Sequence, residues 1–257
     1  MDTPEARAGR VIAMSTLRWT ALLFVTDLAV WGYAVWLYAL GLPVISLLLA
    51  WSALSLLVVT GLYGWACLGH NPGPWMADAM PWWARPVLWP FRLVAWSLMV
   101  VLRRVRGASA APTEVCEGLW LGMHPATSEL EILLLNKVHG VIDLCAELQP
   151  VAQVCVAPFE RLSVPVLDRC VATQAELNEL VMWALAQRAQ GRAVYVHCAF
   201  GRGRSAMVAA VLLLAMGEAR DCEEALARVK AKRPSVSVKG DQRLALERWY
   251  AAKSLAK

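Results

Sequence analysis

Charged residues are nearly absent between Thr20 and Leu68, where Asp27 is the single one. This absence excludes an ordinary soluble domain, and the whole chain, with 58% hydrophobic residues and a mean hydropathy of +0.47, is too apolar for one. Residues 20–40 and 44–68 are each long enough to cross a bilayer, which takes about 20 residues. A short turn separates them. The sequence therefore predicts a transmembrane helical hairpin within residues 1–70.

A cleaved signal peptide is the alternative interpretation of the first segment. It is disfavoured because the apolar run is too long and a second one follows at once. Asp27 lies inside the first predicted span, where an acidic residue is a candidate for function or pairing. With two spans only, a position near the interface or a contact with the hydroxyl of Ser52 or Ser55 is favoured over a transport role.

Basic residues are absent from the turn between the two predicted spans but occur on both outer sides. Because lysine and arginine accumulate on the cytoplasmic side, both ends of the chain are expected there. A richness in Ala, Leu, Val and Arg favours a bacterium, and hence its inner membrane. The orienting residues are Arg7, Arg10 and Arg18 before the first span, and Arg85, Arg92, Arg103, Arg104 and Arg106 after the second.

Prolines and tryptophans alternate in residues 71–106, and arginines close this segment. Tryptophan prefers the level of the lipid headgroups and cations prefer anionic lipid, so we expect a helix over 84–104 that lies in the interface. A third span over 86–102 is the competing interpretation, and it would place everything that follows outside. Small residues at 107–112 predict a linker, so 71–112 is a connecting segment and 113–257 a separate domain.

The seven cysteines form no C-x-x-C pair and no zinc-ligand spacing. On a cytoplasmic face we expect reduced thiols, most of them small buried residues. The chain also lacks internal repeats and low-complexity tracts.

Strand-like and helix-like segments alternate from residue 113 onward. This order predicts an α/β fold with a mostly parallel sheet flanked by helices, in which ligands bind at the carboxyl ends of the strands. Helix starts are expected at three capping residues: Ser128 with Glu131, Thr173 with Glu176, and Asp221. The predicted strands are 118–122, 138–145, 162–167 and 193–198.

The stretch V-Y-V-H-C-A-F-G-R-G-R-S, Val194 to Ser205, joins the last of these strands to an apolar helix. Unpaired N–H groups at a helix N-terminus attract anions, and glycines at 201 and 203 allow the loop to form a nest of amides. Arg204 adds a planar fork suited to phosphate oxygens. Cys198 then lies beneath an anion site, where its thiolate is favoured. This is the arrangement that a phosphatase needs.

A phosphate ester also needs a proton for its leaving oxygen. Asp168 follows the strand-like segment 162–167 on a loop that can reach the same end of the sheet. It is the candidate general acid, and later the general base for water. A role as a cap or loop residue is the alternative. Asp143 and Glu147 are further candidate acids.

The motif H-C-A-F-G-R-G-R-S resembles the H-C-x5-R-S/T signature of cysteine-dependent, dual-specificity-type protein tyrosine phosphatases, and V-P-V-L-D-R resembles their general-acid loop. The resemblance covers roughly residues 113–250. It implies an α/β dual-specificity phosphatase fold and no metal or cofactor. It also implies that Cys198 forms a phosphocysteine while Asp168 protonates the leaving group, that His197 tunes the thiolate, and that Ser205 aids its release. The phosphate would be bound by Arg204 and by the loop residues Ala199, Phe200, Gly201, Arg202 and Gly203.

Two further segments resemble lipid phosphatases. D-L-C-A-E at 143–147 is similar to a segment of phosphatase-and-tensin-type enzymes, which implies that Cys145 can form a disulfide with Cys198; a buried small residue is the alternative. Q-R-L-A-L-E from Gln242 resembles the late helix of mitochondrial-type phosphatidylglycerophosphate phosphatases, which implies a water-positioning role for Gln242; an exposed residue at a helix start is the alternative. The loop departs from phosphoinositide phosphatases, because Arg202 is its only extra cation and it contains no lysine. A single phosphomonoester is therefore favoured.

The predicted function is a membrane-anchored phosphatase for a phospholipid headgroup, with phosphatidylglycerophosphate as the favoured substrate. A membrane-anchored protein tyrosine or dual-specificity phosphatase is the main alternative. A non-catalytic phosphate-binding scaffold, a sulfurtransferase and a phosphatidyl transferase are minor ones. We expect the membrane and a phosphorylated lipid or protein as partners, and no nucleic acid.

Overall fold

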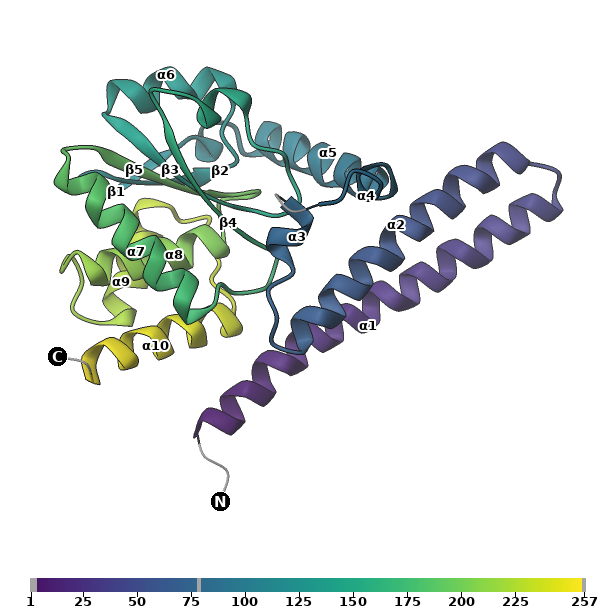
Figure 1. Ribbon diagram of the computed structural model, residues 1–257, viewed down its shortest axis with the longest axis horizontal. Helices are drawn as coiled ribbons and strands as arrows, with labels where there is room; N and C mark the ends of the chain where they lie inside the picture. The colour runs from purple at the N-terminus through teal and green to yellow at the C-terminus, as the bar shows by residue number, and fades with distance from the viewer. Residues whose placement is uncertain (1–3, 78–79, 256–257) are drawn as a thin grey trace. The chain divides into compact units, whose positions relative to one another are not determined.

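The computed structural model describes residues 4–77 and 80–255 (Figure 1). They divide into two compact units, Met1–Leu98 and Met99–Lys257. The second unit begins before the predicted domain start at 113 and includes the predicted linker, which is part helical.

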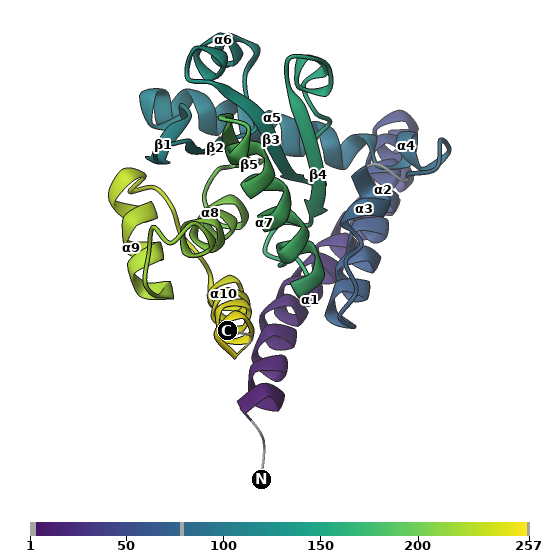
Figure 2. The same ribbon diagram turned by 60° about the vertical axis from the view of Figure 1, so that its left-hand side comes forward.

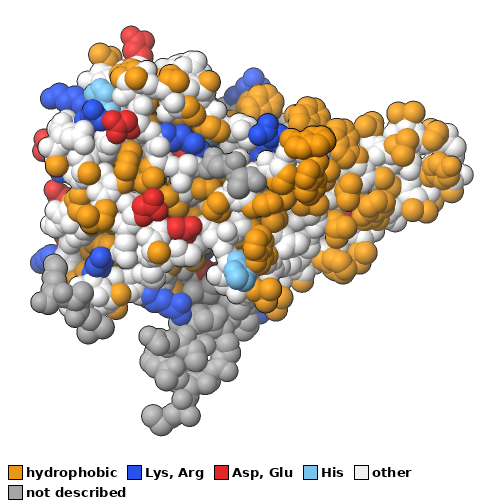
Figure 3. All heavy atoms as spheres, viewed as in Figure 1, with side chains coloured by type: hydrophobic (Ala, Val, Ile, Leu, Met, Phe, Trp, Pro, Cys, Tyr) orange, Lys and Arg blue, Asp and Glu red, His pale blue; other side chains and the backbone are white. Residues whose placement is uncertain are grey.

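The first unit is built around a helical hairpin of α1 (Pro4–Ala39) and α2 (Pro43–Cys67). Leu17–Ala39 and Pro43–Cys67 are both long and apolar enough to cross a membrane. Large apolar side chains such as Val35, Val44 and Leu47 are exposed along it, as Figure 3 shows for the described part of the hairpin. The geometry of the predicted hairpin is thus confirmed.

Asp27 is buried in this hairpin at 2% exposure. Among the described residues its Oδ1 has no hydrogen-bond partner, so the structure offers no bond from that oxygen to Ser52 or Ser55. A different hydroxyl ties the two helices together, because Ser46 Oγ donates to the Ala34 carbonyl at 2.8 Å.

Short helices follow the hairpin: α3 (Gly73–Ala77), α4 (Ala84–Val87) and α5 (Trp89–Arg106). The single helix expected over 84–104 is interrupted at Leu88, because Pro90 has no N–H to continue the ladder and stands instead at the second position of α5. Within the first unit, the Trp51 and Trp89 rings stack with their centroids 6.0 Å apart. The boundary between the units falls inside α5, and the 3-10 helix η1 (Gly107–Ala110) ends the segment.

The second unit contains a five-stranded sheet in the order β1-β2-β5-β3-β4. β1 is antiparallel to β2, and all other pairs are parallel. This confirms the predicted mostly parallel sheet. The four residues of β1 were not predicted, because so short an edge strand carries no alternating pattern. The strands are β1 (Thr113–Cys116), β2 (Leu119–Met123), β3 (Val138–Cys145), β4 (Glu160–Val166) and β5 (Ala193–Cys198).

Helices cover both faces of this sheet (Figures 1 and 2). α6 packs on one face through Leu130 and Leu133, while α7, α8, α9 and α10 contribute to the larger core on the other. α8 is the central helix of that core, with every residue from Arg204 to Leu213 buried. The helices are α6 (Thr127–Leu135), α7 (Gln174–Ala189), α8 (Arg204–Ala215), α9 (Cys222–Lys232) and α10 (Gly240–Leu255), and a 3-10 helix η2 (Ala152–Cys155) precedes β4.

Two of the three predicted helix caps are confirmed. Thr173 Oγ1 accepts from the Glu176 N–H at 3.2 Å, and Asp221 Oδ1 accepts from the Glu224 N–H at 2.8 Å. The cap assigned to Ser128 with Glu131 was wrong. The helix begins at Thr127, and Glu129 is the carboxylate that turns back, to accept from the Ala126 N–H at 2.8 Å.

The sheet packs closely around Gly122, near the carboxyl end of β2. A Cβ at this position would overlap the hydroxyl of Tyr195, which is buried and donates to the Met123 carbonyl at 2.6 Å. We expect Gly122→Ala to lower the free energy of unfolding by about 1–3 kcal/mol through overpacking. Gly240→Ala, where a Cβ would meet no atom within 4 Å, is the control. Denaturant unfolding of the detergent-solubilised chain measures both, and equal midpoints for the two variants would contradict the prediction.

Candidate active site

The candidate site lies where β5 ends and α8 begins. Cys198 is the last residue of β5 and Arg204 the first of α8, so residues 199–203, here called the phosphate loop, connect them. α8 points its N-terminus at this loop, where its first N–H groups and its dipole favour an anion. The sequence predicted this strand–loop–helix arrangement, and the structure has it.

The carbonyl groups of the phosphate loop are engaged in hydrogen bonds. Each accepts a hydrogen bond from outside the loop, and because the C=O and N–H of a trans peptide point in opposite directions, the following N–H groups face the other way. Ala199 O accepts from His124 N–H (3.3 Å), Phe200 O from Arg106 Nη1 (2.8 Å), Gly201 O from Arg233 Nε (3.2 Å) and Arg202 O from Ser237 N–H (2.9 Å).

Gly201 is indispensable to this loop conformation. Its φ is +61°, in the left-handed region that favours glycine, and a Cβ would lie 2.6 Å from the Gly122 carbonyl carbon. The loop therefore packs backbone against backbone on the end of β2.

Arg204 is buried at 2% exposure beneath the loop. Its guanidinium forms a two-point contact with Glu147, with Nη2 to Oε1 at 2.5 Å and Nη1 to Oε2 at 3.0 Å, and Nη1 also donates to the Val166 carbonyl at 2.6 Å. Burial opposes the charge, but the carboxylate of Glu147 outweighs it and raises the pKa of Arg204 well above its usual value. Within the described chain, the buried Nε of Arg204 has no hydrogen-bond partner. One strong donor is therefore left for a ligand.

Cys198 and Asp168 line the same cavity, whose volume is about 230 Å³. Asp168 follows β4 with 47% of its side chain exposed, and its Oδ1 lies 3.3 Å from Arg204 Nη2. Cys198 Sγ lies 3.3 Å from Ser205 Oγ. The structure thus brings together the nucleophile, the arginine, the acid and the hydroxyl that the sequence singled out.

Gln242 also lines the cavity, from the first turn of α10. It is 2% exposed, which overturns the interpretation of an exposed helix-start residue. Its Oε1 accepts from the Lys239 N–H at 3.1 Å, and its amide lies so close to Gly203 that a Cβ there would be 2.8 Å away. Gln242 therefore lies beside the phosphate loop, and its water-positioning role stays a prediction.

His197 directly precedes Cys198 and is fully buried. Burial lowers its pKa to about 4, although the Asp143 carboxylate opposes that shift from 3.8 Å. The ring packs against Tyr195 and His124, with centroid distances of 5.6 and 5.5 Å. At neutral pH the imidazole is uncharged, so any influence on the Cys198 thiolate comes from a neutral ring.

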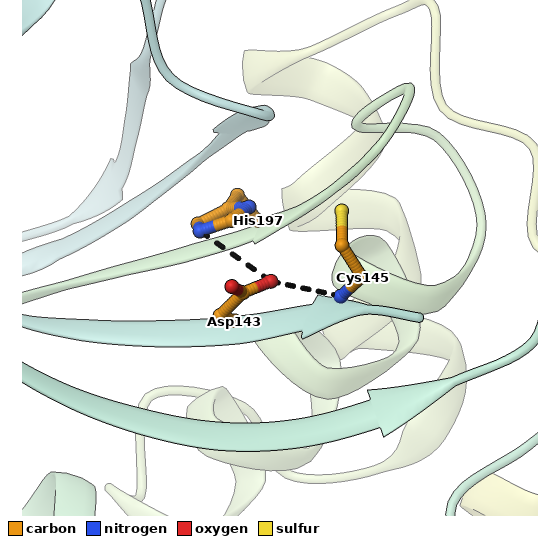
Figure 4. A group of neighbouring side chains, drawn as sticks. All are labelled: Asp143, Cys145 and His197. Carbon is orange, nitrogen blue, oxygen red and sulfur yellow. Dashed lines mark hydrogen bonds and ion pairs between the residues drawn. The ribbon is translucent and has the colours of Figure 1, made fainter. Parts of the chain in front are cut away.

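Asp143, Cys145 and His197 form a buried cluster (Figure 4), and His197 directly precedes Cys198. One ligand atom of each lies within 4.8 Å of the others, which is a spacing that suits a metal ion. The Asp143 carboxylate is already engaged, since it accepts from Cys145 N–H at 2.8 Å and from Arg161 Nε at 3.0 Å. A cation there would face the Arg161 guanidinium. These three side chains therefore fit a structural role, in which they stabilise the fold, better than a metal centre.

Cys145 in this cluster is a free, buried thiol at the end of β3. Burial, together with the carboxylates of Asp143 and Glu147, raises the pKa of Cys145 well above its usual value. Its disulfide with Cys198 stays a prediction. The two further candidate acids differ from Asp168 in exposure. Asp143, paired with Arg161, and Glu147, paired with Arg204, are both buried, so neither can reach a leaving group as Asp168 can.

Several residues of the site had no signal in the sequence. Arg233 directly follows α9 and belongs to no sequence motif. It is nevertheless 3% exposed, and it donates to the carbonyls of Gly201 and Ala111. Arg103 and Arg106 had been counted among lipid-facing cations, but Arg103 pairs with Glu129 at 2.6 Å and Arg106 binds the phosphate loop. Arg104 between them is exposed.

Comparison with known families agrees with this geometry. Residues 119–251 match the family described as "Dual specificity phosphatase, catalytic domain". This chain belongs to that family. It is accordingly a phosphoric monoester hydrolase of the dual-specificity type, as the sequence predicted.

Solved structures of this phosphatase fold cover more than half of the chain. PTPMT1 in complex with PI(5)P is 28% identical, with a TM-score of 0.53 over 57% of this chain and 99% of that one. Human DUSP28 is 25% identical, with a TM-score of 0.51 over 56% of this chain and 99% of that one. No curated protein matches the chain significantly.

The Glu147–Arg204 pair generates a prediction about stability and activity. Glu147→Gln leaves a buried guanidinium without its counter-charge, which should lower the free energy of unfolding by about 3 kcal/mol. We expect kcat/KM for p-nitrophenyl phosphate to fall about 10–100-fold, because Arg204 is no longer fixed. Glu131→Gln, at an exposed position, is the matched control. A Glu147→Gln enzyme with the control's stability and activity would remove this role.

The buried His197 generates a prediction about pH. The unfolded imidazole takes up a proton near pH 6.5 but the folded one only near pH 4, so acid favours the unfolded state in between. The free energy of unfolding should therefore fall by about 3 kcal/mol as the pH falls from 6.5 to 4. Denaturant unfolding across this range should show a slope that His197→Asn loses and His139→Asn keeps. An unchanged slope in His197→Asn would show that other groups cause it.

Proposed function

We propose that this dual-specificity phosphatase hydrolyses a phosphomonoester on a phospholipid headgroup through a phosphocysteine intermediate on Cys198. Phosphatidylglycerophosphate is the first candidate substrate. The observation that carries the chemistry is the buried Arg204 Nε, which has no hydrogen-bond partner in the described chain and follows, across the phosphate loop, the Cys198 thiol that lines the cavity. An orphaned buried donor is costly, and a phosphate oxygen relieves that cost.

In the first step, the Cys198 thiolate attacks phosphorus and the bond to the leaving oxygen breaks. The inward N–H groups of the phosphate loop and Arg204 bind the equatorial oxygens, where negative charge must be held. Asp168 donates its proton to the leaving oxygen, and its partial exposure lets it reach a substrate at the cavity mouth.

In the second step, water attacks the phosphocysteine and gives its proton to the Asp168 carboxylate. Gln242, buried beside Gly203, orients that water. Ser205 Oγ, 3.3 Å from Cys198 Sγ, donates to the sulfur as it leaves as a thiolate. Inorganic phosphate is released and the enzyme returns to its starting state.

The preference for a lipid rests on three observations. The similar PTPMT1 was solved with PI(5)P. The first unit has two helices long and apolar enough to cross a membrane. The cavity is also lined by cations from outside the loop, namely Arg106, Arg169 and Lys239. These cations offset the absence of lysine in the loop and suit a headgroup that carries further negative charge.

The same proposal places the chain in a membrane, with residues 1–70 as the anchor and 71–112 as an interfacial connection to the catalytic domain 113–257. Both ends lie on the cytoplasmic side, and a bacterial inner membrane is the proposed location. An anchored enzyme meets lipid headgroups at a high effective concentration. A phosphoprotein is the second candidate substrate, favoured by the match to the dual-specificity family and by the similarity to human DUSP28.

Substrate competition tests this proposal. The full chain in lipid nanodiscs should release phosphate from phosphatidylglycerophosphate at least about tenfold faster than from a phosphotyrosine peptide at equal concentration, and Cys198→Ser should release none. Phosphate release is measured by a colorimetric assay. A faster reaction with the peptide would favour the protein substrate, and turnover by Cys198→Ser would remove the phosphocysteine mechanism.

A further inference from the structure

Arg106 is the last residue of α5 and joins that helix to the phosphate loop. It is half-buried, and its Nη1 donates to the Phe200 carbonyl at 2.8 Å and lies 3.8 Å from Met123 Sδ. The same side chain lines the cavity that holds Cys198. Arg104, two residues earlier on the same helix, is exposed instead.

The contact fixes the peptide that links Phe200 to Gly201. With its carbonyl bonded to Arg106, this peptide holds the N–H of Gly201 pointing in the opposite direction from that guanidinium. A peptide next to glycine can rotate at small steric cost, because glycine adopts both signs of φ. Rotation would direct a carbonyl oxygen at the phosphate and remove an amide from it. The guanidinium of Arg106 thus selects the orientation that binds an anion.

Other guanidinium groups near this peptide repel that of Arg106. Burial and the nearby Arg202 and Arg233 lower the pKa of Arg106. Arg233 holds the next carbonyl, that of Gly201, at 3.2 Å. Three guanidinium groups around one short loop repel one another, and an anion in the cavity offsets that repulsion.

We propose that Arg106 is a positioning residue of the phosphatase reaction, which keeps the Phe200–Gly201 peptide with its N–H toward the bound phosphate. The phosphate loop is then competent only while the last turn of α5 is docked against it. The inference rests on the proposed phosphate chemistry at Cys198 but on no particular substrate, lipid or protein.

The test compares Arg106→Met, Arg106→Lys and the matched control Arg104→Met in the full chain in detergent. The readouts are kcat and KM for p-nitrophenyl phosphate and the inhibition constant of inorganic phosphate, which occupies the loop alone. We expect Arg106→Met to raise that constant about 10–100-fold and to lower kcat, and Arg104→Met to change neither. Arg106→Lys should recover most of the loss, since one donor suffices for a carbonyl, whereas a lysine cannot replace the fork of Arg204.

The effect should persist in 0.5 M salt, where the Debye length is only about 4 Å and attraction of phosphate by a distant charge is screened. Unaltered phosphate inhibition in Arg106→Met would overturn the proposal. So would an equal loss in Arg106→Lys, which would indicate a merely structural role; unfolding midpoints of all variants identify a variant that fails to fold. A parent enzyme that neither hydrolyses the ester nor binds phosphate would instead refute the proposed function.

Discussion

A guanidinium group buried beneath the phosphate loop sets the arrangement of the catalytic unit. Arg204 is tolerated there because Glu147 and the carbonyls at the ends of β3 and β4 surround it, and this requires β3 to lie between β5 and β4, in the order observed. β3, β4 and the residues that directly follow them thereby supply partners for all but one of the donors of this side chain. The remaining donor is the Nε, so the need to satisfy a buried charge and the ability to bind phosphate arise from the same side chain.

The parts of the site that follow one another in the chain could be predicted from the sequence. Cys198, the two loop glycines and Arg204 lie within one short segment between a strand and a helix, and Asp168 follows another strand, so local pattern and spacing locate them. Four of the five strands were predicted for the same reason. The fold family then places these strand ends at one edge of the sheet.

The residues that hold the loop from outside could not be predicted, because their roles depend on contacts between distant parts of the chain. Arg106, which precedes the loop in the chain, and Arg233, which follows it, donate to neighbouring carbonyls of the loop. Nothing in the composition around Arg106 distinguishes it from Arg104. The burial of Gln242 could not be predicted either, since it depends on Gly203 lying against the first turn of α10.

The complete burial of α8 from Arg204 to Leu213 has a consequence for ionic strength. Mobile counter-ions cannot approach the flank of an enclosed helix, so the field at its N-terminus acts on a bound phosphate nearly undiminished in concentrated salt. Arg202 and Lys239 stand exposed at the cavity mouth, where dissolved ions neutralise them readily. Long-range attraction of an anionic substrate and stabilisation of the reacting phosphate are therefore governed by different charges. Salt therefore weakens the long-range attraction of the substrate but leaves the stabilisation of the reacting phosphate nearly unchanged.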